Sequence, residues 1–207
     1  MPGGIFCIEN WSGNLTSRDT VEPLLRFLVE SQAARVIHRQ VDTRLELGHY
    51  LSRFAALPSY SVGYIAMHGT RGQVQVGAKS IDLETLIEWS SLNDGAPALD
   101  LETEQEIEWT LDLTGKVLYL GSCASLRVSP ARLAALKEQS GAVAICGYTR
   151  NVKWVEAGAV DVMLLSSLAD ATKESPNTVH AAVKRLRKRA GDLLDNLGFV
   201  CEPDWRP

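Results

Sequence analysis

Two short apolar stretches decide the fold: Val62-Gly-Tyr-Ile-Ala-Met-His68-Gly69 and Lys116-Val-Leu-Tyr-Leu-Gly-Ser-Cys123. Each is uniformly apolar, as buried parallel strands are, and each ends in a small residue beside a reactive one. The first run delivers the imidazole of His68 and the second the thiol of Cys123. If the runs are neighbouring parallel strands, both side chains leave the sheet at its carboxyl edge, where open α/β sheets place their chemistry. We therefore hypothesise a Cys/His nucleophilic dyad.

The pattern on either side of these runs alternates strands with helices. Strands are expected at 5–9, 35–41, 61–67, 117–120 and 142–146, with an edge strand at 198–201 and a small hairpin at 73–81. Helices are expected at 21–34, 43–57, 83–89, 129–139, 155–171 and 175–195. Such alternation predicts an α/β fold, with a mostly parallel sheet of about six strands and helices on both faces. A single domain spanning 1–207 accounts for all of it.

Composition and charge exclude several classes of protein. Apolar residues make up 45% of the 207 residues, which is enough for an ordinary globular core. The net charge of −4 argues against a nucleic-acid binder that relies on overall positive charge. No apolar run approaches the roughly 18 residues that cross a bilayer, and the first residues lack the basic region of a secretory signal. We expect a cytoplasmic protein without membrane association.

The four cysteines show no metal-binding pattern. They are far apart, with no CxxC and no paired Cys/His spacing, so we expect no structural zinc site. For the hypothesised Cys/His dyad we expect no metal and no organic cofactor. Cys7 and Cys146 lie inside apolar runs, and Cys201 follows Gly-Phe-Val near the carboxyl terminus. We interpret all three as buried small hydrophobic residues. In a reducing compartment none needs a disulfide bond.

Two charged segments have more than one reading. The stretch 93–112 is acidic and loop-like, which indicates a solvated surface, and the alternatives are a substrate-binding patch or a mobile flap. The basic run 184–189 lies on the last expected helix. It is most simply a solvated helix face, and the alternatives are docking onto an acidic partner or onto an acidic segment of the same chain, with nucleic acid a minor alternative.

Small residues surround both reactive side chains. Gly121-Ser122 precedes Cys123 and Ala124-Ser125 follows it, which leaves the sulfur accessible. Gly69 puts an unobstructed N–H beside His68. That N–H and the N–H of Cys123 are candidates for an oxyanion hole, in which each donor contributes about 3 kcal/mol. The competing reading is that each reactive residue is a structural strand-end residue, as a lone Cys or His usually is.

These features resemble the caspase-like cysteine peptidases (clan CD), the superfamily of caspases, metacaspases and bacterial CHAT domains. The resemblance rests on His68-Gly69 ending one strand, the hairpin after it, and Cys123 ending the next core strand 55 positions later. A separation of about 50 residues is typical of caspases. The segment Ile145-Cys-Gly-Tyr-Thr-Arg-Asn-Val-Lys-Trp154, followed by the helix with Asp161, is similar to the bacterial CHAT-type members. The resemblance covers residues 5 to about 171.

The resemblance implies a caspase-like, flavodoxin-like fold and a set of roles. Cys123 is the expected nucleophile, and His68 is the base that later protonates the leaving amine. Gly69 supplies an oxyanion-hole N–H together with that of Cys123. Family geometry also nominates substrate-binding residues from the strand ends and the 148–154 loop: Asn10, Trp11, Gly121, Tyr148, Arg150 and Trp154.

Specificity does not follow from the resemblance. Caspases surround the nucleophile with Gln-Ala-Cys-Arg-Gly, whereas this chain has Gly121-Ser-Cys-Ala-Ser125. Metacaspases place an Asp, which holds a basic P1 side chain, at the position that Gly121 occupies here. Neither acidic nor basic specificity at P1 is therefore inherited. The short segment 124–141 also leaves no room for a cleavable linker, so we expect a single-chain enzyme.

The function expected from these arguments is that of a bacterial cysteine endopeptidase that cleaves a protein partner. The resemblance suggests an immune or cell-death pathway and control by an activating or regulatory protein. The alternative is a non-catalytic interaction module on the same scaffold. A flavodoxin-like nucleotide-binding domain is a third reading, but neither GxGxxG nor a P-loop follows the first strand.

Overall fold

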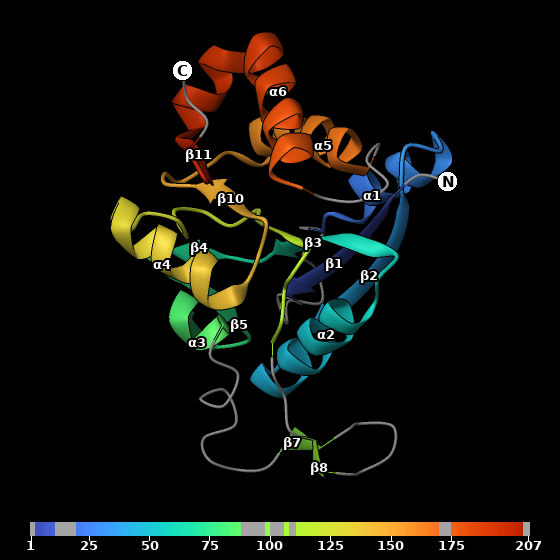
Figure 1. The fold of residues 1–207 in the computed structure, drawn as a ribbon, viewed down its shortest axis with the longest axis vertical. Helices are drawn as coiled ribbons and strands as arrows, with labels where there is room; N and C mark the ends of the chain where they lie inside the picture. The colour runs from blue at the N-terminus through green and yellow to red at the C-terminus, as the bar shows by residue number, and fades with distance from the viewer. Residues whose placement is uncertain are drawn as a thin grey trace.

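The computed structural model describes residues 3–10, 20–87, 98–99, 106–107, 111–169 and 175–204. Its centre is a six-stranded sheet in the order β11-β10-β9-β3-β1-β2 (Figure 1). The strands are β1 (Gly4–Asn10), β2 (Arg35–Val41), β3 (Tyr60–Ala66), β9 (Val117–Leu120), β10 (Ala144–Tyr148) and β11 (Phe199–Glu202). All neighbours pair in parallel except β10 and β11. The predicted α/β class and mostly parallel sheet are confirmed.

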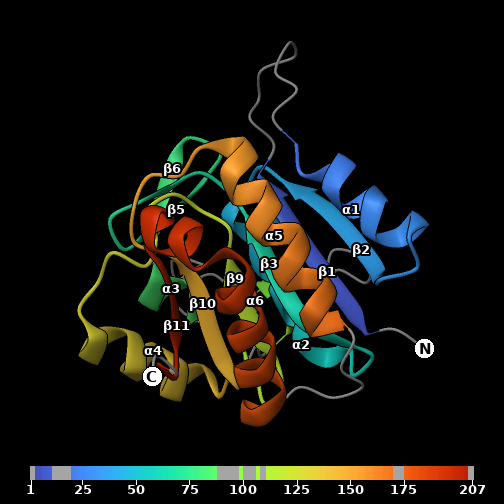
Figure 2. The same cartoon turned by 90° about the horizontal axis from the view of Figure 1, so that it is seen from above.

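Helices cover both faces of this sheet (Figures 1 and 2). One layer consists of α1 (Glu22–Glu30), α5 (Trp154–Ala169) and α6 (Pro176–Leu197). The other consists of α2 (Arg44–Ala56), α3 (Leu83–Ile87) and α4 (Pro130–Ser140). Each layer packs its apolar side chains against one sheet face, which gives two separate core clusters.

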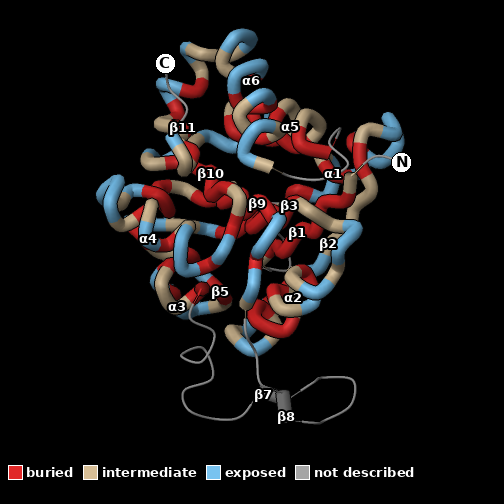
Figure 3. The backbone as a smooth tube through the Cα atoms, viewed as in Figure 1, coloured by how far each residue is buried: buried red, intermediate tan, exposed pale blue. Residues whose placement is uncertain are grey.

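Strand β1 shows why the central runs are uniformly apolar. Ile5 and Cys7 belong to the cluster under α1, α5 and α6, whereas Phe6 and Ile8 belong to the cluster under α2, α3 and α4. Successive side chains of a strand point to opposite faces, so a sheet covered on both sides needs apolar residues at every position. Buried residues accordingly concentrate along the central strands (Figure 3).

Local sequence signals set the helix starts. Thr43 forms a capping box with Glu46 at the start of α2, and the side chain of Ser129 accepts from the N–H of Arg132 at the start of α4. Ser175 caps α6 in the same way. Helix α4 occupies the crossover between β9 and β10, as the short 124–141 segment predicts.

The hairpin differs from expectation by one strand. Besides β5 (Gln73–Val76) and β6 (Lys79–Asp82), the short strand β4 (Gly69–Thr70) joins the ladder. The reason is that the ladder continues back to His68, whose carbonyl accepts the N–H of Gln75 at 2.8 Å. The chain directly after β3 is therefore held in an extended conformation.

Cys146 and Cys201 are buried as predicted, but the expectation that they need no disulfide is corrected, because they are bonded to each other. They lie directly opposite each other in the antiparallel β10–β11 ladder, with Cα atoms 4.0 Å apart. Cys7 and Cys123 are free thiols, and Cys7 is buried as predicted.

The acidic stretch lies mostly outside the described residues. Two short strands within it, β7 (Ala98–Leu99) and β8 (Glu106–Ile107), pair in an antiparallel way. The rest of 93–110, where a flap is an alternative reading, lies outside the described ranges. Among the helices of the described residues, none combines the length and apolar character needed to cross a bilayer.

Candidate active site

The site lies where β3 and β9 end. These strands are parallel neighbours, with Val62 opposite Val117 and Ile65 opposite Leu120. The adjacency predicted from the two apolar runs is thus confirmed. His68 and Cys123 follow these strands and line one cavity of about 300 Å³, which we call the edge cavity.

Gly69 brings the two strand ends into direct contact. A Cβ atom added at Gly69 would lie 2.5 Å from the carbonyl oxygen of Cys123 and 2.7 Å from Cβ of Ser122. Only glycine permits this approach, because a real Cβ cannot come so close to backbone. The backbone beside the imidazole therefore packs on the backbone that carries the thiol.

Two backbone N–H groups are available at this contact. The backbone carbonyl of His68 accepts the N–H of Gln75, which makes the next pair in the ladder, Gly69 and Val74, a non-hydrogen-bonded pair. The N–H of Gly69 therefore points away from β5. Among the described residues, the N–H of Cys123 has no hydrogen-bond partner either. The two groups predicted for an oxyanion hole are therefore not used by the β-ladder or the turn.

The thiol is held by the loop that follows β10. The N–H of Val152 donates to Sγ of Cys123 at 3.4 Å, and the thiol donates to the carbonyl of Val152 at 3.7 Å. The next N–H, of Ala124, donates to the carbonyl of Arg150 at 2.9 Å. Ala124 has a φ of 49°, in the left-handed region that alanine rarely adopts. These contacts fix a sharp turn with the sulfur on its cavity side.

The imidazole of His68 is exposed at the cavity mouth. Within the described part of the chain, it makes no hydrogen bond or ion pair, and none joins it to Sγ of Cys123. Catalytic hydrogen bonds are often long or misaligned before substrate binds, so this geometry leaves a base role open.

The predicted substrate-binding residues separate into three groups. Asn10, Gly121 and Trp154 line the edge cavity with the dyad residues. Tyr148 and Arg150 do not: the Tyr148 side chain is in the core, and Arg150 is exposed and donates to the carbonyl of Asn196. Trp11 lies outside the described residues. The substrate-binding role of each of these six residues stays a prediction.

Sequence reasoning did not assign a role to a buried carboxylate that lines the same cavity. Asp161 on α5 is 4% exposed, and three phenols donate to it. The hydroxyl of Tyr64 lies 2.7 Å from Oδ2, and those of Tyr119 and Tyr148 donate to Oδ1, the latter at 3.0 Å. Burial raises the pKa of Asp161 to about 6, even though the three hydrogen bonds act to lower it.

A sequence signal for this group exists in retrospect. The three adjacent strands β3, β9 and β10 each carry a tyrosine near the carboxyl half of the strand, Tyr64, Tyr119 and Tyr148, and α5 carries a single Asp. Tyr64 lies opposite Tyr119 in the β3–β9 pairing, so their rings share a face and stack with centroids 5.3 Å apart.

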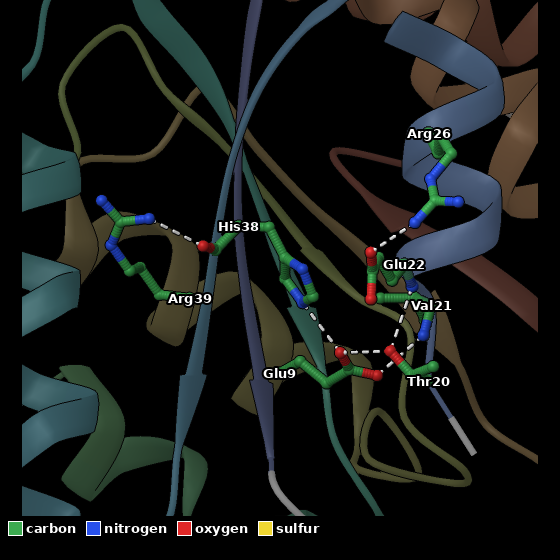
Figure 4. Close-up of polar contacts among 7 residues, drawn as sticks. All are labelled: Glu9, Thr20, Val21, Glu22, Arg26, His38 and Arg39. Atoms are coloured by element: carbon green, nitrogen blue, oxygen red, sulfur yellow. Dashed lines mark hydrogen bonds and ion pairs between the residues drawn. The ribbon is translucent and has the colours of Figure 1, made fainter. Parts of the chain in front are cut away.

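A second carboxylate, Glu9 near the end of β1, also lines the cavity. Figure 4 shows its polar contacts. Glu9 accepts from the N–H of Val21 at 2.7 Å, the hydroxyl of Thr20 at 2.8 Å, and pairs with Nε2 of His38 at 2.7 Å. Burial raises the pKa of Glu9, but hydrogen bonds from His38, Val21 and Thr20 outweigh burial, so the pKa lies below its usual value.

No family model and no curated protein matches this chain in comparisons with known proteins. The geometry of the edge cavity is therefore the basis for inferring its function. In the described ranges, no three His, Cys, Asp or Glu side chains converge as a metal site requires.

Proposed function

We propose that this protein is a cysteine endopeptidase of caspase-like type, with Cys123 as nucleophile and His68 as general base. The observation that carries the proposal is that both side chains line one cavity at the ends of adjacent parallel strands. The contact of Gly69 with the Cys123 backbone supports it further, since it brings together two residues whose N–H groups have no hydrogen-bond partner among the described residues.

The proposed reaction uses these groups in a fixed order. His68 accepts the thiol proton as Sγ of Cys123 attacks the carbonyl carbon of the scissile peptide. The N–H groups of Gly69 and Cys123 donate to the oxyanion that develops. The protonated imidazole then gives its proton to the leaving amine as the C–N bond breaks, which leaves a thioester.

Hydrolysis of the thioester completes the cycle. His68 takes a proton from water as the water oxygen attacks the thioester carbon, and the C–S bond breaks as the proton returns to sulfur. No metal or organic cofactor takes part in this sequence. The family resemblance extends the proposal to a regulated cut in one protein partner in the bacterial cytoplasm, within an immune or cell-death pathway.

A non-catalytic interaction module is the second candidate. The observation that favours it is the pairing of the Cys123 thiol with the backbone of Val152 rather than with His68. An interaction module would keep this pairing, whereas a peptidase would exchange it for the imidazole when substrate binds.

The experiment that separates the two candidates measures whether Cys123 reactivity depends on His68. Cys7 is buried and Cys146 is bonded to Cys201, so selective labelling of Cys123 follows from accessibility alone. The informative quantity is the labelling rate of a peptidyl acyloxymethylketone relative to iodoacetamide, followed by intact mass.

For a peptidase, His68→Ala is expected to lower the acyloxymethylketone rate about 100-fold or more, because general-base contributions are typically of that size. His180→Ala, on α6, serves as the matched control and should leave the rate unchanged. Equal rates in the unsubstituted protein and in His68→Ala would favour the interaction module. Co-expression with candidate partner proteins, comparing the unsubstituted chain with Cys123→Ala, then identifies the substrate.

A further inference from the structure

The edge cavity is negatively charged. Glu9 and Asp161 both line it, and among the described residues of its lining there is no Lys or Arg. Much of the wall between them is apolar and includes Val21, Met67 and Val152. An apolar wall around a few fixed charges is the usual composition of a site that recognises an amphipathic group.

The two carboxylates differ in how they are neutralised. Glu9 pairs with Nε2 of the basic side chain His38 and accepts two further hydrogen bonds, from the N–H of Val21 and the hydroxyl of Thr20. Asp161 accepts only from neutral phenols, and no described Lys, Arg or His pairs with it. Its Oδ2 accepts one hydrogen bond, from Tyr64, and has capacity for another. A buried carboxylate without a cation is costly, which makes Asp161 the natural partner for an incoming positive charge.

Helix α5 places the Asp161 carboxylate in the buried part of the edge cavity. Trp154, Ala157 and Asp161 follow the i, i+3, i+7 spacing of one helix face, and all three line the cavity. Trp154 is 53% exposed at the first turn, whereas Asp161 is 4% exposed. At a rise of 1.5 Å per residue, the Cα atom of Asp161 lies about 10 Å along the helix axis from that of Trp154, so the carboxylate is at the closed end of this face.

The ring of Tyr64 leaves no room for an acidic side chain at position 121, two residues before Cys123. A Cβ atom at Gly121, two residues before Cys123, would lie 2.5 Å from the Tyr64 ring. The same ring holds Asp161 through its hydroxyl. The space beside the nucleophile is thus filled by an aromatic ring, and a negative charge is supplied from α5 instead.

We propose that the edge cavity recognises a Lys or Arg side chain of the substrate, on the acyl side of the peptide bond that Cys123 attacks. The ammonium or guanidinium group pairs with Asp161, and the aliphatic stem packs on Val21, Met67 and Val152. The proposal rests on the proposed function for its position in the substrate, but the binding of a cation is independent of catalysis.

The test measures binding to the Cys123→Ala chain, in which no turnover occurs. The ligands are N-acetyl-arginine methylamide and its neutral isostere N-acetyl-citrulline methylamide, followed by NMR titration. The charged ligand is expected to bind at least 10-fold more tightly. Asp161→Asn should abolish the difference, and Tyr148→Phe, which perturbs the same cluster but keeps the carboxylate, should retain it.

Equal affinity for the two ligands in the chain with Asp161 intact would overturn the proposal without any further variant. A charge preference that survives Asp161→Asn would overturn the assignment to Asp161. The two proposals can also fail separately. If the preference for the charged ligand depends on Asp161 but the labelling rate of Cys123 does not depend on His68, the cation pocket is supported and the peptidase function is contradicted. Reactivity that depends on His68 without a charge preference would do the reverse.

Discussion

Gly69 and Cys123 are in backbone contact, and the contact depends on the absence of a side chain at Gly69: a Cβ atom there would lie 2.5 Å from the Cys123 carbonyl oxygen. Gly69 follows β3 and Cys123 follows β9, so the contact ties together the two strand ends that carry the imidazole and the thiol. It fixes their separation through backbone, which is less adaptable than side-chain packing.

Gly69→Ala is expected to push these strand ends apart. Overpacking of this kind costs about 1–3 kcal/mol in the free energy of unfolding. The alkylation rate of Cys123 by an acyloxymethylketone should fall by at least 10-fold, since the oxyanion donors and the imidazole move together. Urea denaturation and intact-mass kinetics measure the two effects.

Gly191→Ala is the matched control, because an added Cβ there meets no described atom within 4 Å outside its own helix. It should leave the labelling rate unchanged. If Gly69→Ala behaved like Gly191→Ala in both measurements, the close contact would not be what positions the site.

The thiols should titrate in three steps. In the native protein without reductant, iodoacetamide should modify Cys123 alone, because Cys7 is buried. Unfolding without reductant should expose Cys7 as the second thiol, and reduction should release Cys146 and Cys201. Peptide mapping after each step checks the order. Four thiols in the unfolded, unreduced protein would show that the β10–β11 pair is not bonded.

The sequence predicts the sheet and the adjacency of the two strands that precede His68 and Cys123, because both depend on local signals. Uniform apolar runs identify buried parallel strands, and Thr43, Ser129 and Ser175 mark where helices begin. Alternation of strands and helices then leaves few topologies, and the parallel neighbours β3 and β9 follow from it.

The Asp161 cluster and the disulfide depend on tertiary placement that no local pattern contains. Tyr64, Tyr119 and Tyr148 each look like an ordinary core aromatic in sequence, and only the strand order and the seating of α5 bring their hydroxyls to one carboxylate. Cys146 and Cys201 are 55 residues apart and meet because β11 runs antiparallel to β10.

Glu9 should stabilise the fold above its unfolded pKa and lose this effect in acid. Its folded pKa is lowered, so the contribution is fully present above about pH 4.5 and is lost as pH falls through the folded value. Glu9→Gln is expected to lower the free energy of unfolding at pH 7 by about 1.5–3 kcal/mol, typical of hydrogen bonds to a charged group. Denaturation between pH 3 and 7 measures the difference.

The control for this prediction is Glu22→Gln. Glu22 is exposed, and within the described ranges its carboxylate pairs only with Arg26 on the same helix (Figure 4), so its loss should change stability by no more than about 0.5 kcal/mol. A loss of stability in Glu9→Gln that stayed constant from pH 3 to 7 would show that packing, rather than charge, is responsible.

Asp161 should act on stability with the opposite sign. Burial raises its pKa from 3.8 to about 6, so its contribution is fully present below about pH 4 and is lost as pH rises through 6. A shift of this size corresponds to about 3 kcal/mol. The free energy of unfolding of Asp161→Asn, relative to that of the unsubstituted protein, should therefore rise by that amount between pH 4 and pH 7.5, whatever the Asn itself costs. Urea denaturation at each pH measures it.

Asp192→Asn, at an exposed position of α6, is the control and should show a constant difference over the same range. A constant difference for Asp161→Asn as well would mean that the carboxylate is already compensated in the folded protein, and would remove the charge that the edge cavity is proposed to offer a substrate cation.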